Sequence, residues 1–169
     1  MLKLLDRIAD RVQLWGMRKN QNGFVDGVRL TSIRAEPSDA FARTIQASLA
    51  LIHDIDPRRY TLITGYFSWV CDGWLRRSLP VKYFPSTRSC IVNFRPLPGF
   101  SDERMAALYA CLLIQGATDA VTMRYKCRHT DKDAVWCARI LTIEHNRFAE
   151  RLASVDSEKY PLSLFRMVG

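Results

Sequence analysis

Gln115 and Asp119 lie four residues apart in the stretch LLIQGATDA, which covers residues 112–120. On a helix this spacing puts both side chains on one face, where two ligands can hold a single metal ion. Glutamine is a poor zinc ligand, however, and Gly116 has no side chain that could transfer a proton. The stretch therefore has the spacing of a metal site but lacks the groups that zinc chemistry needs.

The segment LIQGATDA (residues 113–120) resembles the active-site helix of small bacterial zincin-like metallopeptidases, where an apolar lead-in precedes His-Glu-Ala-Thr-His-Ala. The resemblance covers residues 38–152. Within that range, the short strands expected before the helix and the stretches DPRRY (56–60) and RFAERL (147–152) are similar to the plan of such proteins. It implies a zincin-like helix pair in the C-terminal half of the chain.

The resemblance also implies a role for each position. Gln115 and Asp119 would replace the two metal-binding histidines, and Gly116 would replace the general base. Glu144 would stand for the third ligand, which in gluzincins is often a glutamate on a following helix. The implied protein is a pseudoenzyme of metallopeptidase-like fold, with no metal and no cofactor.

A second interpretation gives LLIQGATDA no site at all. It is then a buried helix in which Gly116 allows a neighbouring element to approach closely, at a cost of about 1 kcal/mol in helix propensity relative to alanine. Neither interpretation predicts hydrolysis by zinc.

Cysteine and histidine residues offer another set of metal ligands. Cys127, His129, Cys137 and His145 could supply sulfur and nitrogen atoms, but their spacing matches no standard zinc finger. Buried thiols and a histidine on a polar face are the simpler interpretation. The five cysteines form no Cys-x-x-Cys pair, which favours reduced thiols and a cytoplasmic location. We nominate no nucleophile, because the partners of a catalytic thiol meet only in the folded chain.

The predicted partner-binding surface combines aromatic and basic residues, the types that dominate the energetics of protein interfaces. Its members between positions 69 and 84 are Trp69, Trp74, Arg76, Arg77 and Tyr83. A second basic stretch is expected beside them and contains Arg124, Lys126 and Arg128. The alternative for each aromatic residue taken singly is a place in the core of a small sheet.

The elements that position these residues alternate between helical and extended patterns. Residues 1–19 carry an apolar stripe, which predicts an amphipathic helix that packs on the same domain rather than on a membrane. Alternation from Val25 to Ile33 predicts a strand or hairpin. A helix is predicted from Ser38 until Pro57 ends it. The apolar residues of that helix repeat at helical spacing and are Phe41, Ile45, Leu49 and Ile52.

Short strands are predicted within residues 60–70, 81–84 and 89–94, which are rich in β-branched and aromatic side chains. Ser101, followed by two acidic residues, predicts the N-terminus of the helix that carries LLIQGATDA. A final helix is predicted from about residue 130 to about residue 153. The expected fold class is α+β, with a small sheet of short strands and about four helices in one domain of residues 1–169.

Composition limits the function. The chain carries a formal net charge of +8 and 48% apolar residues. No purely apolar run approaches the roughly 20 residues that cross a bilayer, so we expect no transmembrane segment. The leading interpretation is a non-catalytic protein-binding module, such as a bacterial immunity or inhibitor-type protein, that neutralises an acidic partner. The alternatives are a degenerate or unconventional metallopeptidase and, third, a nucleic-acid-binding protein.

Overall fold

The computed structural model describes Gly16 and residues 21–32, 39–73, 75, 80–124 and 131–167. The predicted N-terminal helix lies outside the described residues, apart from Gly16. So do several predicted site residues, namely Trp74, Arg76, Arg77, Lys126, Cys127, Arg128 and His129.

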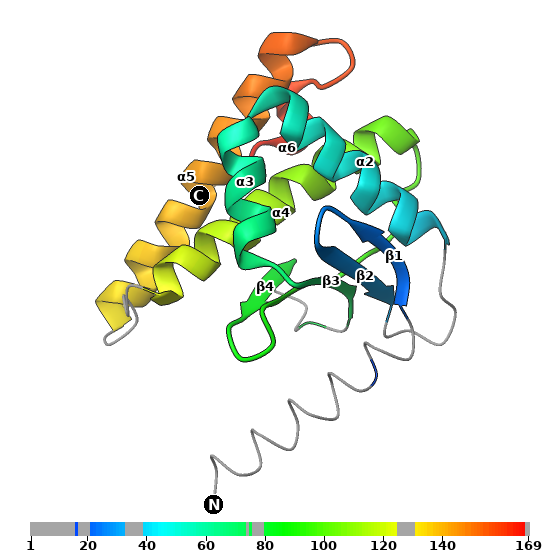
Figure 1. The fold of residues 1–169 in the computed structure, drawn as a ribbon. Helices are drawn as coiled ribbons and strands as arrows, with labels where there is room; N and C mark the ends of the chain where they lie inside the picture. The colour runs from blue at the N-terminus through cyan, green and yellow to red at the C-terminus, as the bar shows by residue number, and fades with distance from the viewer. Residues whose placement is uncertain are drawn as a thin grey trace, which may run out of the picture.

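A five-stranded mixed sheet forms one layer of the molecule (Figure 1). Its strands run β1-β2-β3-β5-β4 across the sheet. The three central strands are parallel, and each outer strand pairs antiparallel with its neighbour. The strands are β1 (Gln21–Val25), β2 (Val28–Ser32), β3 (Trp69–Asp72), β4 (Val81–Phe84) and β5 (Ser89–Val92).

The first hairpin confirms the prediction made from the alternation between residues 25 and 33. Its turn consists of Asp26 and Gly27, whose φ angles are +44° and +86°. A two-residue turn with both angles positive matches the twist of the flanking strands, and Asp-Gly is a favoured pair for it. This turn fixes the register of β1 on β2.

Five helices are described: α2 (Asp39–Ile55), α3 (Pro57–Tyr66), α4 (Asp102–Arg124), α5 (Asp131–Val155) and α6 (Leu162–Phe165). Together with the sheet they make an α+β fold, as the sequence predicts. The helices gather on one side of the sheet (Figure 1). The signal at Ser101 is correct, because its hydroxyl oxygen accepts a hydrogen bond of 3.3 Å from the backbone nitrogen of Arg104 in the first turn of α4.

The prediction of a strand within residues 60–70 is wrong for its first part. Residues 57–66 form α3, and only the end of the segment belongs to β3. Pro57 does follow the end of α2, but it also starts α3, because Asp56 caps this helix and accepts a hydrogen bond from the backbone nitrogen of Arg59. Thr61 and Thr64 satisfy their hydroxyl groups on backbone carbonyls four residues earlier, so β-branched residues are accommodated in a helix.

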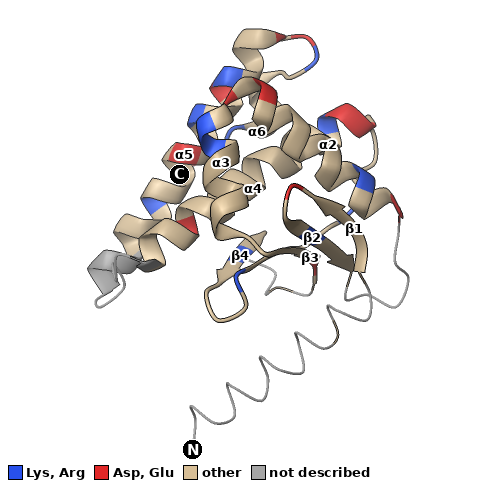
Figure 2. Cartoon of the chain, viewed as in Figure 1, with Lys and Arg blue, Asp and Glu red and all other residues tan. Residues whose placement is uncertain are grey.

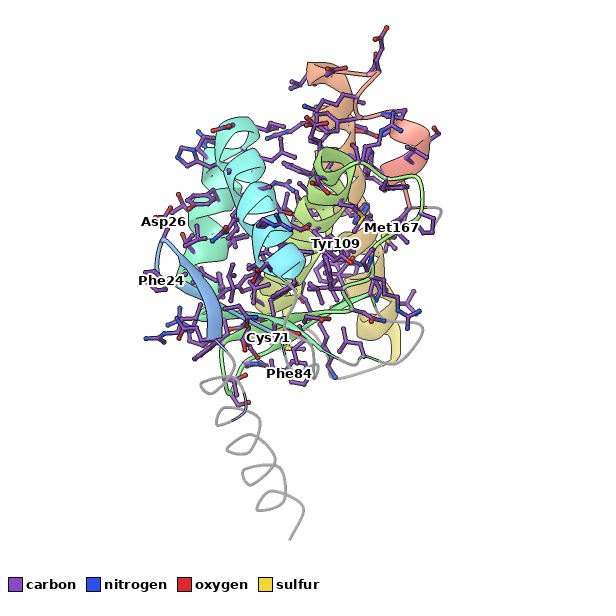
Figure 3. All side chains as sticks on the ribbon, turned by 90° about the vertical axis from the view of Figure 1, so that its right-hand side faces the viewer. Phe24, Asp26, Cys71, Phe84, Tyr109 and Met167 are labelled. Carbon is purple, nitrogen blue, oxygen red and sulfur yellow. The ribbon has the colours of Figure 1, made fainter. Side chains whose placement is uncertain are left out.

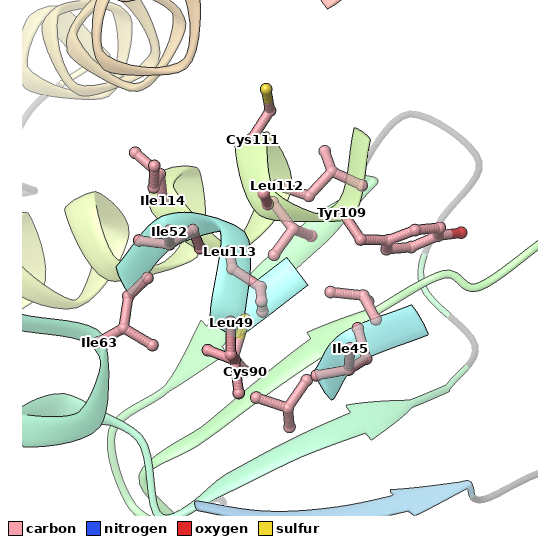
Figure 4. Packing of buried hydrophobic residues seen from close by; sticks show 14 of the residues in the cluster. Ile45, Leu49, Ile52, Ile63, Cys90, Tyr109, Cys111, Leu112, Leu113 and Ile114 are labelled. Atoms are coloured by element: carbon pink, nitrogen blue, oxygen red, sulfur yellow. The ribbon is translucent and has the colours of Figure 1, made fainter. Parts of the chain in front are cut away.

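The main core lies between the sheet and the helices. Leu49 of α2, Leu113 of α4 and Cys90 of β5 meet there (Figure 4). The four apolar residues predicted to face inward from α2 are all fully buried, namely Phe41, Ile45, Leu49 and Ile52. A smaller cluster on the other face of the sheet contains Trp69, Cys71 and Ile91, with Phe84 packed against it (Figure 3).

α4 is the central helix of the fold and packs against α2, α5 and β4. Residues 102–123 are long and apolar enough to cross a membrane, with a mean hydropathy of 1.3 in one 18-residue window. Of that window, 83% is buried inside the protein. Within the described part of the chain, this apolar segment is therefore a core helix, and no transmembrane segment is evident.

Candidate functional site

Gly116 is the contact point between α4 and the sheet. A Cβ atom at this position would lie 2.6 Å from Sγ of Cys90, 3.2 Å from Cγ2 of Val81 and 3.4 Å from Cζ of Phe67. Any larger residue would therefore overlap the buried thiol of β5. This is the close approach that the buried-helix interpretation of LLIQGATDA requires.

Asp119 and Gln115 lie on a buried face of α4, and Asp119 faces a structural partner. Oδ2 of Asp119 accepts a hydrogen bond from the backbone nitrogen of Tyr83 at 3.2 Å. Because β4 is the last strand of the sheet, this carboxylate covers part of its edge. Gln115 is buried beside it, and its Oε1 atom has no hydrogen-bond partner within the described part of the chain.

Glu144, the implied third ligand, lies on a different side of α4. Its carboxylate contacts the guanidinium groups of Arg59 and Arg147, the latter at 2.7 Å. A small cavity beside it is lined on α4 by Ile114, Ala117 and Thr118 rather than by Gln115 or Asp119. The described residues contain no group of three or more His, Cys, Asp and Glu side chains placed to hold a metal ion.

The stretches DPRRY and RFAERL meet in an ionic network that ties α3 to α5. Asp56 contacts Nε of Arg59 at 3.1 Å and Nη1 of Arg151. Arg59 also reaches Glu144 through both its carboxylate and its backbone carbonyl. Arg147 joins the network through Glu144. The network therefore contains two acidic side chains, Asp56 and Glu144, and three basic ones, Arg59, Arg147 and Arg151. In this structure, the two stretches that resemble a peptidase plan form a packing contact between helices.

Two of the predicted partner-binding residues belong to the core. Trp69 is 4% exposed and Tyr83 is 5% exposed, so neither presents a surface to a partner. Trp69 packs in the smaller cluster beneath the guanidinium group of Arg29, and Tyr83 stacks on Phe67. Trp69 lies on β3, a parallel central strand, and such strands are buried on both faces. Tyr83 lies on the outer strand β4 and is covered because it faces the main core beneath the helices. The rest of the predicted surface, including the Arg124 side chain, lies outside the described residues.

The described cysteines are buried thiols. Burial raises the pKa of Cys71, and the neighbouring Asp72 adds to this shift. Burial likewise raises the pKa of Cys111 to about 12 and that of Cys90 well above its usual value. Because the thiolate is the nucleophile, these three cysteines are unreactive at neutral pH.

His145 of α5 holds the chain that follows α6. Its Nε2 atom lies 2.8 Å from the backbone oxygen of Phe165. Nδ1 is buried and has no partner within the described residues. Burial lowers the pKa of His145, and the hydrogen bond to Phe165 opposes this shift. The histidine is therefore neutral at pH 7 and acts as a structural donor.

A groove that the sequence reading missed lies beside this contact, and we call it the α5 groove. It has a volume of about 880 Å³. On α5 it is lined by Ala138, Arg139, Thr142, Ile143 and Asn146. On the other side it is lined by Ser163, Arg166 and Met167, of which the last is labelled in Figure 3.

Exposed apolar side chains continue the groove along α5. Trp136 is 51% exposed and Ile143 is 40% exposed. Together with Arg139 they occur at positions i, i+3 and i+7, so they share one face of the helix. That spacing is the signal in the sequence from which this surface could have been found.

The described lining residues include two guanidinium groups, those of Arg139 and Arg166, and no carboxylate. The nearby carboxylate of Glu144 is already in contact with Arg59 and Arg147. Elsewhere, Lys and Arg residues are mixed with Asp and Glu over the helices (Figure 2). The α5 groove thus combines an apolar surface with two positive charges.

No known protein family matches this chain, and no curated protein or solved structure matches it either. The geometry of the groove is therefore the main indication of function.

Proposed function

We propose that this protein is a non-catalytic protein-binding module that holds an acidic segment of another protein in the α5 groove. The observation that carries the proposal is the exposed face of Trp136, Arg139 and Ile143 beside a groove of about 880 Å³. Tryptophan and arginine are the residues most often found at the energetic centres of interfaces. An immunity or inhibitor-type protein would use such a surface to neutralise its partner.

The two other functions receive less support. The metallopeptidase interpretation needs Asp119 and Glu144 as ligands, but Asp119 caps the edge of β4, and Glu144 is ion-paired on another side of α4. The nucleic-acid interpretation needs a continuous basic face. The mixture of charges over the described helices does not favour one.

Affinity capture tests the proposal. The wild-type protein, the groove variant Trp136→Ala/Arg139→Glu and the control variant Arg43→Glu are used as baits in a nuclease-treated lysate of the native host, and bound proteins are quantified by mass spectrometry. Arg43 is an exposed arginine on α2, so it matches the loss of charge without touching the groove.

We expect an acidic protein to be retained by the wild type and the control but not by the groove variant. Equal retention by all three baits would overturn the proposal. Binding that is seen in a parallel untreated lysate and is absent after nuclease treatment would instead support the nucleic-acid interpretation.

A further inference from the structure

The C-terminal wall of the α5 groove has little capacity to pair with an added strand. Both hydrogen-bonding groups of the Met167 backbone are used by the side-chain amide of Asn146, at 2.8 and 3.0 Å. The backbone oxygen of Phe165 is taken by His145, and the backbone nitrogen of Arg166 donates to Leu162. An extended segment would therefore find few backbone partners on this wall, whereas a helix satisfies its backbone hydrogen bonds internally.

The shape of the groove also suits a helix. Its α5 lining recurs at positions 138 and 139, 142 and 143, and 146, which are successive turns of one helix. At 1.5 Å per residue this lining extends for about 12 Å, the length of roughly two turns. A helix lying along it would present side chains at positions i, i+4 and i+7, the usual pattern of anchors in a groove of this kind.

The charge of the groove selects the partner. Arg139 stands on the α5 side, and Arg166 stands on the opposite wall. A second copy of this chain is a poor occupant, because a two-fold contact would bring the same arginines together in a protein whose net charge is already +8. Carboxylates on the partner would instead complement both walls and speed its association.

We propose, building on the proposed function, that the α5 groove binds an acidic amphipathic helix. Its apolar side chains pack on Trp136, Ile143 and Met167, and carboxylates on its two flanks contact Arg139 and Arg166. The predicted ligand is thus a short helical segment with net negative charge and apolar residues one turn apart.

A peptide selection tests this directly. The probe is a phage-displayed library of unbiased 16-residue peptides, selected on the full wild-type chain after depletion on the Arg139→Glu/Arg166→Glu variant. Enriched peptides are then synthesised, and their affinities are measured by fluorescence anisotropy at two salt concentrations. Circular dichroism records the helicity that each peptide gains on binding and verifies that every protein variant is folded.

We expect enriched peptides to be acidic, to carry apolar residues at i, i+4 and i+7, and to become helical when bound. Each single substitution, Arg139→Glu or Arg166→Glu, should lower affinity about tenfold, mainly through slower association. The control variant Arg43→Glu should bind as the wild type does.

Neutral, proline-containing or extended peptides would overturn the inference, as would no enrichment at all. A dimer in sedimentation experiments that Arg139→Glu converts to monomer would overturn it too, because the occupant would then be a second copy. The two proposals can fail separately. If host proteins are captured through the groove but the selected peptides are not helical, the proposed function stands and only the helical ligand is overturned.

Discussion

The carboxylate of Asp119 accepts a hydrogen bond from the backbone nitrogen of Tyr83, with 3.2 Å between Oδ2 and the nitrogen. The contact joins the C-terminal half of α4 to the last strand of the sheet, and both residues are buried. A position that resembles a metal ligand in the sequence thus serves as a cap for a strand edge.

Asp119→Ala should lower the free energy of unfolding by about 1–3 kcal/mol, because it leaves the buried N–H of Tyr83 without its acceptor. Asp119→Asn keeps an acceptor oxygen and should cost less. Urea denaturation of both variants measures the difference. If the alanine variant is as stable as the wild type, the contact does not stabilise the fold.

Gly116→Ala should destabilise the protein, although alanine is the better helix former. Overpacking against Cys90 costs about 1–3 kcal/mol, whereas alanine gains only about 1 kcal/mol over glycine in a helix. In a Cys90→Ala background the Sγ atom is gone, so the same change at position 116 should become neutral or stabilising.

Denaturation is measured for the wild type, the two single variants and the double variant. We expect the double variant to be more stable than the sum of the two single effects predicts. Additive effects would mean that Gly116 and Cys90 do not compete for the same space.

Acidification should destabilise the protein through His145. Because burial lowers the pKa of this histidine in the folded chain, the unfolded chain takes up the proton first, below about pH 6.5. The contribution of His145 to stability is therefore complete above about pH 6.5 and is lost as the pH falls from there through the lower pKa of the folded state.

The measurement is the unfolding free energy at pH 7 and at pH 5.5. His145→Gln should flatten this dependence, since a glutamine amide can still donate to Phe165 but does not titrate. His53→Gln, at an exposed position on α2, should keep the wild-type dependence. Identical profiles for all three proteins would contradict the assignment.

The purified protein should contain no stoichiometric zinc, because Gln115 is a weak ligand and Asp119 and Glu144 have separate partners. Elemental analysis by mass spectrometry measures the zinc content, and Asp119→Ala serves as the control. One zinc per wild-type chain that is lost in this variant would revive the peptidase interpretation.

Local signals predict most of the fold. Ser101 with the acidic residues after it places the start of α4 correctly, and the apolar spacing of α2 identifies its buried face. The error at residues 60–66 has a physical cause: β-branched side chains suggest a strand, but the Asp56 cap and the proline after it initiate a helix. Helix capping prevails here over side-chain propensity.

The candidate site is harder to predict, because burial and contact arise from tertiary packing. Trp69 and Tyr83 have the composition of an interface, but Trp69 is buried in the smaller cluster and Tyr83 in the main core. Trp136, in contrast, is exposed. Its position on an amphipathic helix does not reveal which face of that helix remains exposed to solvent. Neither outcome follows from residue type alone.

The central position of α4 has a consequence for the order in which the chain is made. α2 precedes it and α5 follows it, so the helix is complete before one of its covering partners has been synthesised. Until α5 folds against it, α4 lacks one of the elements that cover an apolar helix long enough to cross a bilayer. Cys111, which points away from the sheet in Figure 4, lies on the side that is still uncovered. We therefore expect a chain truncated before α5 to expose this apolar side of α4 and to aggregate more readily than the full chain.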